Sequence, residues 1–192
     1  MNNIHLESAS SDDWLHCVLL NFDEFLIDHA ANERKASSMA MSLVAHYPDK
    51  KKLVSSMIDL AVEELNHFRQ VMRLLEDRNL IVTADEKDPY VNEMRTHVRK
   101  GPEEYFLDRL LSGAVIEARG EERFRRISES LEDEKLKNFY SRLAISERGH
   151  HELFVKLANT YFEHNLVSER LDEWLTIEEK IIRNLPIRSR LH

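Results

Sequence analysis

Two short motifs in the chain carry side chains that bind metals. Glu64-Leu65-Asn66-His67 and Glu147-Arg148-Gly149-His150 both read Glu-x-x-His. In a helix with 3.6 residues per turn, this spacing places the carboxylate and the imidazole side by side. Carboxylate and imidazole ligands suit iron or manganese and argue against a metal held by thiolates. A single Glu-x-x-His is common on the solvated face of a charged helix, so neither motif is decisive alone.

Each motif is preceded by one more glutamate at a matching distance. Glu33 lies about thirty residues before Glu64, and Glu117 lies about thirty residues before Glu147, so the chain contains the same two-helix pattern twice. Dimetal carboxylate proteins use this ligand set, with one Glu from each of two helices and a Glu-x-x-His from each of the other two. We predict two metal ions, and no catalytic residue or cofactor-binding residue beyond their ligands. The predicted ligands are Glu33, Glu64, His67, Glu117, Glu147 and His150.

Four long helices are expected to position these side chains, over about residues 21–45, 49–78, 101–130 and 132–161. On each helix, steps of three and four residues follow an apolar stripe that is interrupted near its middle by a glutamate. The stripes are Phe22, Leu26, His29, Glu33, Ala36, Ala40 and Leu43; Leu53, Met57, Leu60, Glu64, His67, Val71 and Leu74; Phe106, Leu110, Gly113, Glu117, Gly120, Phe124 and Ile127; and Leu136, Tyr140, Leu143, Glu147, His150, Phe154, Leu157 and Tyr161. A carboxylate in such a stripe costs several kcal/mol unless its charge is compensated, and no Lys or Arg lies on these stripes. Bound cations would supply that compensation.

Shorter elements complete the expected fold. A short helix begins near Ser11, residues 79–88 form a loop, another short helix covers 89–100, and Ser168 caps a last helix that stops before Pro186. With only 4 Gly and 4 Pro among 192 residues, the chain has few breakers for the turns of an all-β protein. We predict an all-α, ferritin-like four-helix bundle with additional short helices. It forms a single domain over 1–192, with the bundle core at about 21–162 and a C-terminal helix and basic tail at about 167–192.

Several neighbours of the predicted ligands allow two interpretations. His29 lies one turn before Glu33 and either lines the metal pocket or is a core histidine held by a hydrogen bond, which we favour. Glu63 could replace Glu64 or support His67 from outside, although position 64 follows the apolar stripe better. His151 should point about 100° away from His150, so we expect it to lie on the surface or to face a partner. Gly113 and Gly120 flank Glu117 and either leave space for oxygen or substrate or permit close helix packing.

Charge and cysteine content bear on location and partners. The formal net charge is −8, and Cys17 is the one cysteine, so no internal disulfide can form. With no signal peptide and no long apolar run, we expect a cytoplasmic protein without membrane contact. Despite the acidic charge, the stretch from Lys180 to His192 carries no acid, and the runs Arg95–Lys100 and Arg119–Arg126 are basic. These cations either contact phosphates or belong to solvated helix faces, and the tail could instead be disordered.

The motifs together resemble a known family. They are Asp108-Arg109-Leu110-Leu111, Ile116-Glu117-Ala118-Arg119, Glu122-Arg123-Phe124, Glu63-Glu64-Leu65-Asn66-His67-Phe68 and Glu147-Arg148-Gly149-His150. Over roughly residues 22–161 the sequence is similar to the bacterial tRNA-(2-methylthio-N6-isopentenyladenosine) hydroxylases, the MiaE family. The resemblance implies a ferritin-like diiron monooxygenase, with its iron ligands on the six residues named above.

The resemblance also implies the reaction and its partners. Such enzymes use O2 and two electrons to hydroxylate the isopentenyl side chain of a modified adenosine beside the tRNA anticodon. The expected cofactors are therefore two iron ions, with O2 as co-substrate and a separate reductase as electron donor, because no flavin, nicotinamide or iron–sulfur motif is present. Two alternatives remain open: a ferritin-like iron oxidase or storage protein, and a diiron oxygenase acting on a different substrate.

Overall fold

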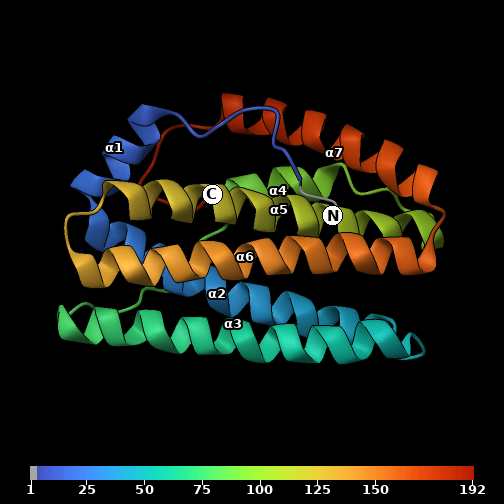
Figure 1. The fold of residues 1–192 in the computed structure, drawn as a ribbon, viewed down its shortest axis with the longest axis horizontal. Coiled ribbons are helices and arrows are strands. Elements are labelled where there is room, and N and C mark those ends of the chain that lie inside the picture. Colours follow the sequence, from blue (N-terminus) through green and yellow to red (C-terminus); the bar gives the residue numbers. More distant parts are fainter. Residues whose placement is uncertain (1–3) are drawn as a thin grey trace. The chain divides into compact units, whose positions relative to one another are not determined.

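The computed structural model describes residues 4–192 and confirms the all-α prediction. Within this range the chain forms seven helices and no strand (Figure 1). They are α1 (Asp12–Leu20), α2 (Phe22–His46), α3 (Lys51–Asp77), α4 (Pro89–Thr96), α5 (Pro102–Ser130), α6 (Glu134–Tyr161) and α7 (His164–Asn184). The four long helices predicted from the apolar stripes correspond to α2, α3, α5 and α6.

Helix boundaries follow the local capping signals. The Ser11 hydroxyl accepts a hydrogen bond from the backbone of Trp14 at 3.1 Å and thereby caps α1. Asp88 and Asp133 cap α4 and α6 in the same way, each accepting from two backbone N–H groups. At the end of α3, Asn79 adopts a left-handed conformation with φ 57°, and Leu80 N donates to Leu75 O, which closes the helix as a glycine often does.

The described residues form two compact units. One unit comprises residues 16–86 and 188–191 and is built on the antiparallel pair α2 and α3. The two helices pack through apolar side chains that are fully buried, among them Leu26, Leu43 and Leu53. Near the middle of the pair, the Ser37 hydroxyl donates to the carbonyl of Ala61 at 2.9 Å and fixes the register of the helices.

The other unit is built on the antiparallel pair α5 and α6. It contains the described residues up to Leu15, together with Lys87–Ile187 and His192. Helix α7 packs against α5 and α4 in this unit (Figure 1). Trp174 of α7 is fully buried, and Phe124 and Tyr140 bring α5 and α6 together with their ring centroids 5.6 Å apart.

Two predicted boundaries are wrong. Helix α7 begins at His164, not at Ser168, because the earlier turn allows Val167 to be buried. Helix α4 ends at Thr96, not near Lys100, because the backbone N–H of Arg99 donates to Asp108 at 2.8 Å instead of continuing the helix.

Within the part of the chain that the structure describes, none of the helices combines the length and the apolar character needed to span a bilayer. The organisation of residues 1–192 as a single domain stays a prediction.

Candidate metal centre

The pair α2 and α3 brings three of the predicted ligands together. Glu33 comes from α2, whereas Glu64 and His67 come from α3, and one ligand atom of each lies within 4.8 Å of the others. His67 Nδ1 lies 3.3 Å from Glu64 Oε2 and 3.6 Å from Glu33 Oε2. We call these three residues the α2–α3 half-site.

The two carboxylates of the α2–α3 half-site change the acidity of the imidazole. Burial by itself disfavours the charged ring, but the hydrogen bonds and negative charges of Glu33 and Glu64 outweigh it and raise the pKa of His67 to about 10. Without a metal, the proton on His67 Nδ1 therefore balances part of the negative charge. A metal ion would take over this role after displacing the proton.

The neighbours His29 and Glu63 take different places around this half-site. His29 is fully buried, and its Nε2 lies 2.6 Å from Glu33 Oε1, which confirms the favoured interpretation of a core histidine held by a hydrogen bond. The Glu63 side chain is 50% exposed, and its nearest oxygen lies 4.0 Å from His67 Nε2. Glu64 is buried, so the stripe position was the better guide to which glutamate faces inward.

The pair α5 and α6 repeats the arrangement. Glu117 comes from α5, Glu147 and His150 come from α6, and again one ligand atom of each lies within 4.8 Å of the others. His150 Nδ1 lies 3.1 Å from Glu147 Oε2. We call these three residues the α5–α6 half-site. The six predicted ligands are all buried, with exposed fractions between 1% and 8%.

The glycines beside Glu117 have different surroundings. A Cβ on Gly113 would lie 3.3 Å from two ring atoms of Phe154, so this glycine permits close packing of α5 against α6. A Cβ on Gly120 would meet Glu147 Cγ at 3.8 Å, an ordinary contact. Of the two interpretations, close packing therefore applies at Gly113.

The expectation for His151 is wrong. This residue is fully buried, and its Nε2 lies 3.0 Å from Glu121 Oε2 on α5. The 100° step from His150 turns the ring toward α5 instead of solvent. Burial alone would raise the pKa of the Glu121 carboxyl, but hydrogen bonds from His151 and Arg148 outweigh it and lower that pKa.

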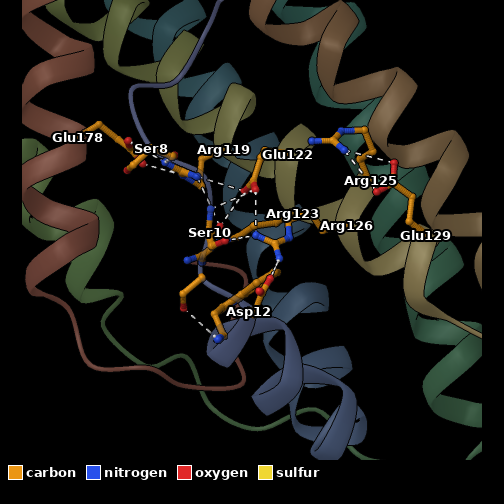
Figure 2. Close-up of polar contacts among 12 residues, drawn as sticks. Ser8, Ser10, Asp12, Arg119, Glu122, Arg123, Arg125, Arg126, Glu129 and Glu178 are labelled. Atoms are coloured by element: carbon orange, nitrogen blue, oxygen red, sulfur yellow. Dashed lines mark hydrogen bonds and ion pairs between the residues drawn. The ribbon is translucent and has the colours of Figure 1, made fainter.

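The basic run Arg119–Arg126 is largely internal. The Arg119 side chain is fully buried and donates to both oxygens of Glu178 on α7, at 2.7 and 2.9 Å (Figure 2). Arg123 is also buried. Arg125 lies on the surface, where it pairs with Glu129. The run Arg119–Arg126 is therefore neither an open phosphate-binding face nor a solvated helix face.

The same arginines anchor the N-terminal segment. Ser10 donates through its hydroxyl to Glu122 at 2.7 Å and accepts from Arg123 Nε at 3.0 Å (Figure 2). Arg119 donates to the carbonyl of Ser8 at 2.9 Å. More than a hundred residues separate these partners in sequence, so no local pattern could have revealed them.

The sequence analysis did not identify Asp108 as a buried acid outside the half-sites. Asp108 on α5 is fully buried, and its oxygens accept from Arg99, Arg170 and Trp174. Burial alone would raise the pKa of Asp108, but the hydrogen bonds from Arg170 and Arg99 outweigh it and lower that pKa. We call Asp108, Arg99, Arg170 and Trp174 the Asp108 cluster. It holds α7 and the segment after α4 onto α5.

The basic tail is docked and not disordered. Arg190 reaches the carboxylates of Glu86, Glu24 and Asp28 at 3.2, 3.4 and 3.5 Å, and Leu191 N donates to Asp28 at 2.8 Å. The Arg190 guanidinium is thus committed to acids of its own chain.

The donor set of the half-sites fits a pair of redox-active metal ions. Each half-site offers two carboxylates and one imidazole, all of them buried. Hard carboxylate and borderline imidazole donors in this ratio suit iron and manganese.

Comparison with known proteins identifies relatives along the whole chain. Residues 1–192 match the family model described as tRNA-(MS[2]IO[6]A)-hydroxylase (MiaE). The chain is similar to a tRNA 2-(methylsulfanyl)-N(6)-isopentenyladenosine(37) hydroxylase of Pseudomonas putida KT2440, with 34% identity over 97% of this chain and 91% of that protein. A protein of the same name from Salmonella typhimurium LT2 is 31% identical over 86% of this chain, which spans 60% of that longer protein.

A solved structure shares the fold. Protein 43 with aldehyde deformylating oxygenase activity from Synechococcus is 32% identical and superimposes with a TM-score of 0.93, covering 98% of this chain and 96% of that one. The predicted ferritin-like, all-α fold class is therefore confirmed.

Proposed function

Since the chain belongs to the tRNA-(MS[2]IO[6]A)-hydroxylase (MiaE) family, we propose that it hydroxylates the isopentenyl side chain of a 2-methylthio-N6-isopentenyl-modified adenosine next to the tRNA anticodon. The chain is then an O2-dependent non-haem diiron monooxygenase. The observation that carries the proposal is the pair of buried half-sites, each with two glutamates and one histidine, in a chain that is related to tRNA hydroxylases over its whole length.

Two iron ions would be held by the six ligands of the two half-sites, Glu33, Glu64, His67, Glu117, Glu147 and His150. Bound iron would activate O2, which the hydroxylation of a hydrocarbon group requires. The chain's own part is to hold the metals and to keep water away from the oxidising site. Each half-site places carboxylates in an apolar stripe, and bound cations would neutralise their negative charge.

Apolar and aromatic side chains near the half-sites would favour a greasy substrate group. Phe25 and Phe154 are fully buried, and Phe25 lies against His29 with ring centroids 5.9 Å apart. Such side chains would exclude water and would favour contact with an isoprenoid group. Breaking the C–H bond would need no side chain that acts as a general base. One oxygen atom of O2 enters the product, and the other leaves as water, which takes up two protons together with the two electrons.

The reaction requires two electrons from outside the chain. We propose a separate reductase as the donor, and tRNA in the cytoplasm as the substrate. The docked Arg190 and the internal Arg119 and Arg123 are unsuited to phosphate contacts, so other cations would hold the tRNA.

The test is an assay with iron-loaded protein, O2, a chemical reductant and tRNA that carries the isopentenyl-modified adenosine. We expect a mass gain of one oxygen on that nucleoside, and no gain with tRNA from cells that lack the isopentenyl group. A parallel arm with an aldehyde addresses the activity named for the Synechococcus protein. Consumption of O2 with aldehyde turnover but no hydroxylated nucleoside would redirect the proposal to that substrate class. Iron uptake into a mineral core without either product would favour the storage alternative.

A further inference from the structure

Glu121 joins the two helices of the α5–α6 half-site close to their predicted ligands. It lies on α5 four residues after Glu117, which is one helical turn further along nearly the same face. Its two partners on α6, Arg148 and His151, belong to the turn that carries the other two ligands of the half-site. The contact therefore ties α5 to α6 within one turn of a ligand on each helix.

Each oxygen of the Glu121 carboxylate accepts from a different side chain of α6. Oε1 accepts from Arg148 Nε at 3.0 Å and also from Nη2 of the same guanidinium. Oε2 lies 3.0 Å from His151 Nε2, which must donate because an ionised carboxylate only accepts hydrogen bonds. The Glu121 side chain is 14% exposed, and His151 is fully buried. Charge-assisted bonds of this kind are strong and directional, so one carboxylate fixes two points of α6.

The same stretch of α5 also lies against a predicted ligand. A Cβ on Gly120 would lie 3.8 Å from Cγ and 4.0 Å from Cδ of Glu147, so this side chain passes close to the α5 backbone directly before Glu121. His150 Nδ1 in turn lies 3.1 Å from Glu147 Oε2. A shift of α6 along α5 would therefore move Glu147 and His150 together, relative to Glu117.

Apolar contacts hold the two helices together on either side of this level. The rings of Phe124 and Tyr140 have centroids 5.6 Å apart, and Gly113 lies against the ring of Phe154. Hydrophobic attraction is not directional, so it resists a small slide of one helix along the other less than hydrogen bonds do. Glu121 is thus the contact suited to set the register of the ligands.

We propose that Glu121 is a positioning residue that binds Arg148 and His151 of α6 and thereby holds the α5–α6 half-site in the register that binds metal. This inference rests on the metal centre of the proposed function, but not on the identity of the substrate. Metal ligands must be held within about 0.5 Å of their productive places. Groups that support a metal site from outside the ligand set contribute about 10-fold to 100-fold in affinity. Because Glu121 acts through neighbours of the ligands, we expect the lower end of this range.

The test is an anaerobic titration of the full chain with Fe(II), followed by Mössbauer spectra of the 57Fe-loaded protein. In Glu121→Ala, at least one Fe(II)-binding step should weaken by about 10-fold relative to the wild type, and part of the spectrum should change. Glu121→Gln keeps an oxygen that accepts from Arg148, and its amide can donate to the other tautomer of His151. It should therefore restore most of the affinity and the wild-type spectrum.

Matched variants separate positioning from stability. Glu129→Ala removes an exposed ion pair of α5 and should leave both the affinity and the spectrum unchanged. Leu136→Ala, on α6 three turns before the ligands, should lower the melting temperature without changing the affinity. If Glu121→Ala does not fold, Arg148→Ala takes its place, because the Arg148 side chain is 52% exposed, and it should weaken iron binding in the same step.

Three results would overturn the inference. They are wild-type affinity and spectrum in Glu121→Ala or its substitute, equal losses in Glu121→Ala and Glu121→Gln, and an equal loss of affinity in Leu136→Ala. A wild type that binds no iron would overturn the metal centre together with this inference. The expected loss of affinity in a protein that never hydroxylates tRNA would refute the proposed substrate alone.

Discussion

At the residue scale, burial separates side chains that the sequence places next to each other. Glu63 and Glu64 are adjacent acids, but the Glu63 side chain is half exposed and Glu64 is buried. His150 and His151 are adjacent imidazoles, and both are buried, because one faces Glu147 and the other faces Glu121 on α5. Only a contact with a neighbouring helix explains the burial of His151.

The adjacent glutamates give a direct test of the ligand set. We expect Glu64→Ala to reduce the iron content well below two per chain, because it removes a predicted oxygen ligand that is buried. Glu63→Ala is the matched control and should retain iron, since its carboxylate lies largely in solvent. Metal analysis after anaerobic loading and desalting measures both. Equal iron in the two variants would contradict the assignment of Glu64.

The Asp108 cluster predicts a pH-dependent stability. Asp108→Asn removes the buried anionic partner of Arg170 and leaves it only Glu173, which is largely exposed; breaking a buried pair typically costs about 3–5 kcal/mol. The pKa of Asp108 in the folded protein lies below its ordinary value of 3.8, so its contribution to stability is fully present above pH 3.8 and is lost as the pH falls through the folded-state pKa. The difference in unfolding free energy between wild type and Asp108→Asn should therefore be large at pH 7 and shrink below pH 3.8. Urea titrations across this range measure it, and a difference that grows toward low pH would contradict the role of the ionised carboxylate.

At the scale of elements, the two helical hairpins share a ligand pattern but pack differently. Gly113 allows α5 to approach Phe154 of α6, whereas His29 occupies the corresponding position of α2. Gly149 on α6 is different again, because a Cβ there would meet no atom within 4 Å. The glycine at 149 is therefore not required by packing inside the chain.

These two glycines should respond oppositely to alanine. Gly149→Ala should raise the free energy of unfolding by about 1 kcal/mol, the gain in helix propensity. Gly113→Ala has the same gain, but overpacking against the Phe154 ring costs about 1–3 kcal/mol, so we expect a net loss. Thermal and urea unfolding of both variants decide this. If Gly113→Ala stabilised the protein as much as Gly149→Ala, the Phe154 ring would accommodate the added Cβ without any loss of unfolding free energy.

At the scale of the whole molecule, most of the suspected phosphate-binding cations have partners within the chain. Arg119 and Arg123 hold the N-terminal segment through Ser8 and Ser10, and Arg190 holds the tail on acids of α2 and of the loop before α4. These three arginines therefore do not contribute to a basic face, because they contact groups of their own chain. This agrees with the net charge of −8. Cations such as Arg188, for which the described contacts include no carboxylate, are better candidates for RNA.

The tail arginines provide a test of this division. Arg190→Gln should lower the free energy of unfolding by about 1 kcal/mol, because three partly solvated ion pairs are lost, and should leave the salt dependence of tRNA binding unchanged. Arg188→Gln is the matched variant. If the tail contacts RNA through this residue, it reduces the salt slope by about one without affecting stability. A reduced salt slope for Arg190→Gln would mean that the Arg190 guanidinium of the wild type exchanges its carboxylate partners for phosphates when tRNA binds.

The local and periodic features of this protein were determined by the sequence alone. Four long helices and the inward glutamates follow from the 3.6-residue period, and they agree with α2, α3, α5 and α6. Most positions of the predicted stripes are buried, but Phe22, Ala36, Leu74 and Tyr161 are only partly buried, and Leu75 is buried in place of Leu74. The duplicated Glu and Glu-x-x-His pattern likewise predicts Glu33 beside Glu64 and His67, and Glu117 beside Glu147 and His150, as the structure has them. Side chains a turn apart on one face must be neighbours in a helix, which accounts for Glu64 with His67 and for Glu147 with His150. The glutamate from the preceding helix was assigned from the repeat of the pattern and the ligand set of dimetal bundles, not from helix spacing.

Tertiary structure alone decided which charges are buried and with which partners. The pairing of Arg119 with Glu178, the cluster around Asp108 and the burial of His151 join residues on different helices. The first residues of α7 were also missed, because burial of Val167 compensates for the missing capping side chain. A charged side chain is stable in the interior only beside a partner, and that partner is set by how helices meet. Local periodicity contains no information about that meeting.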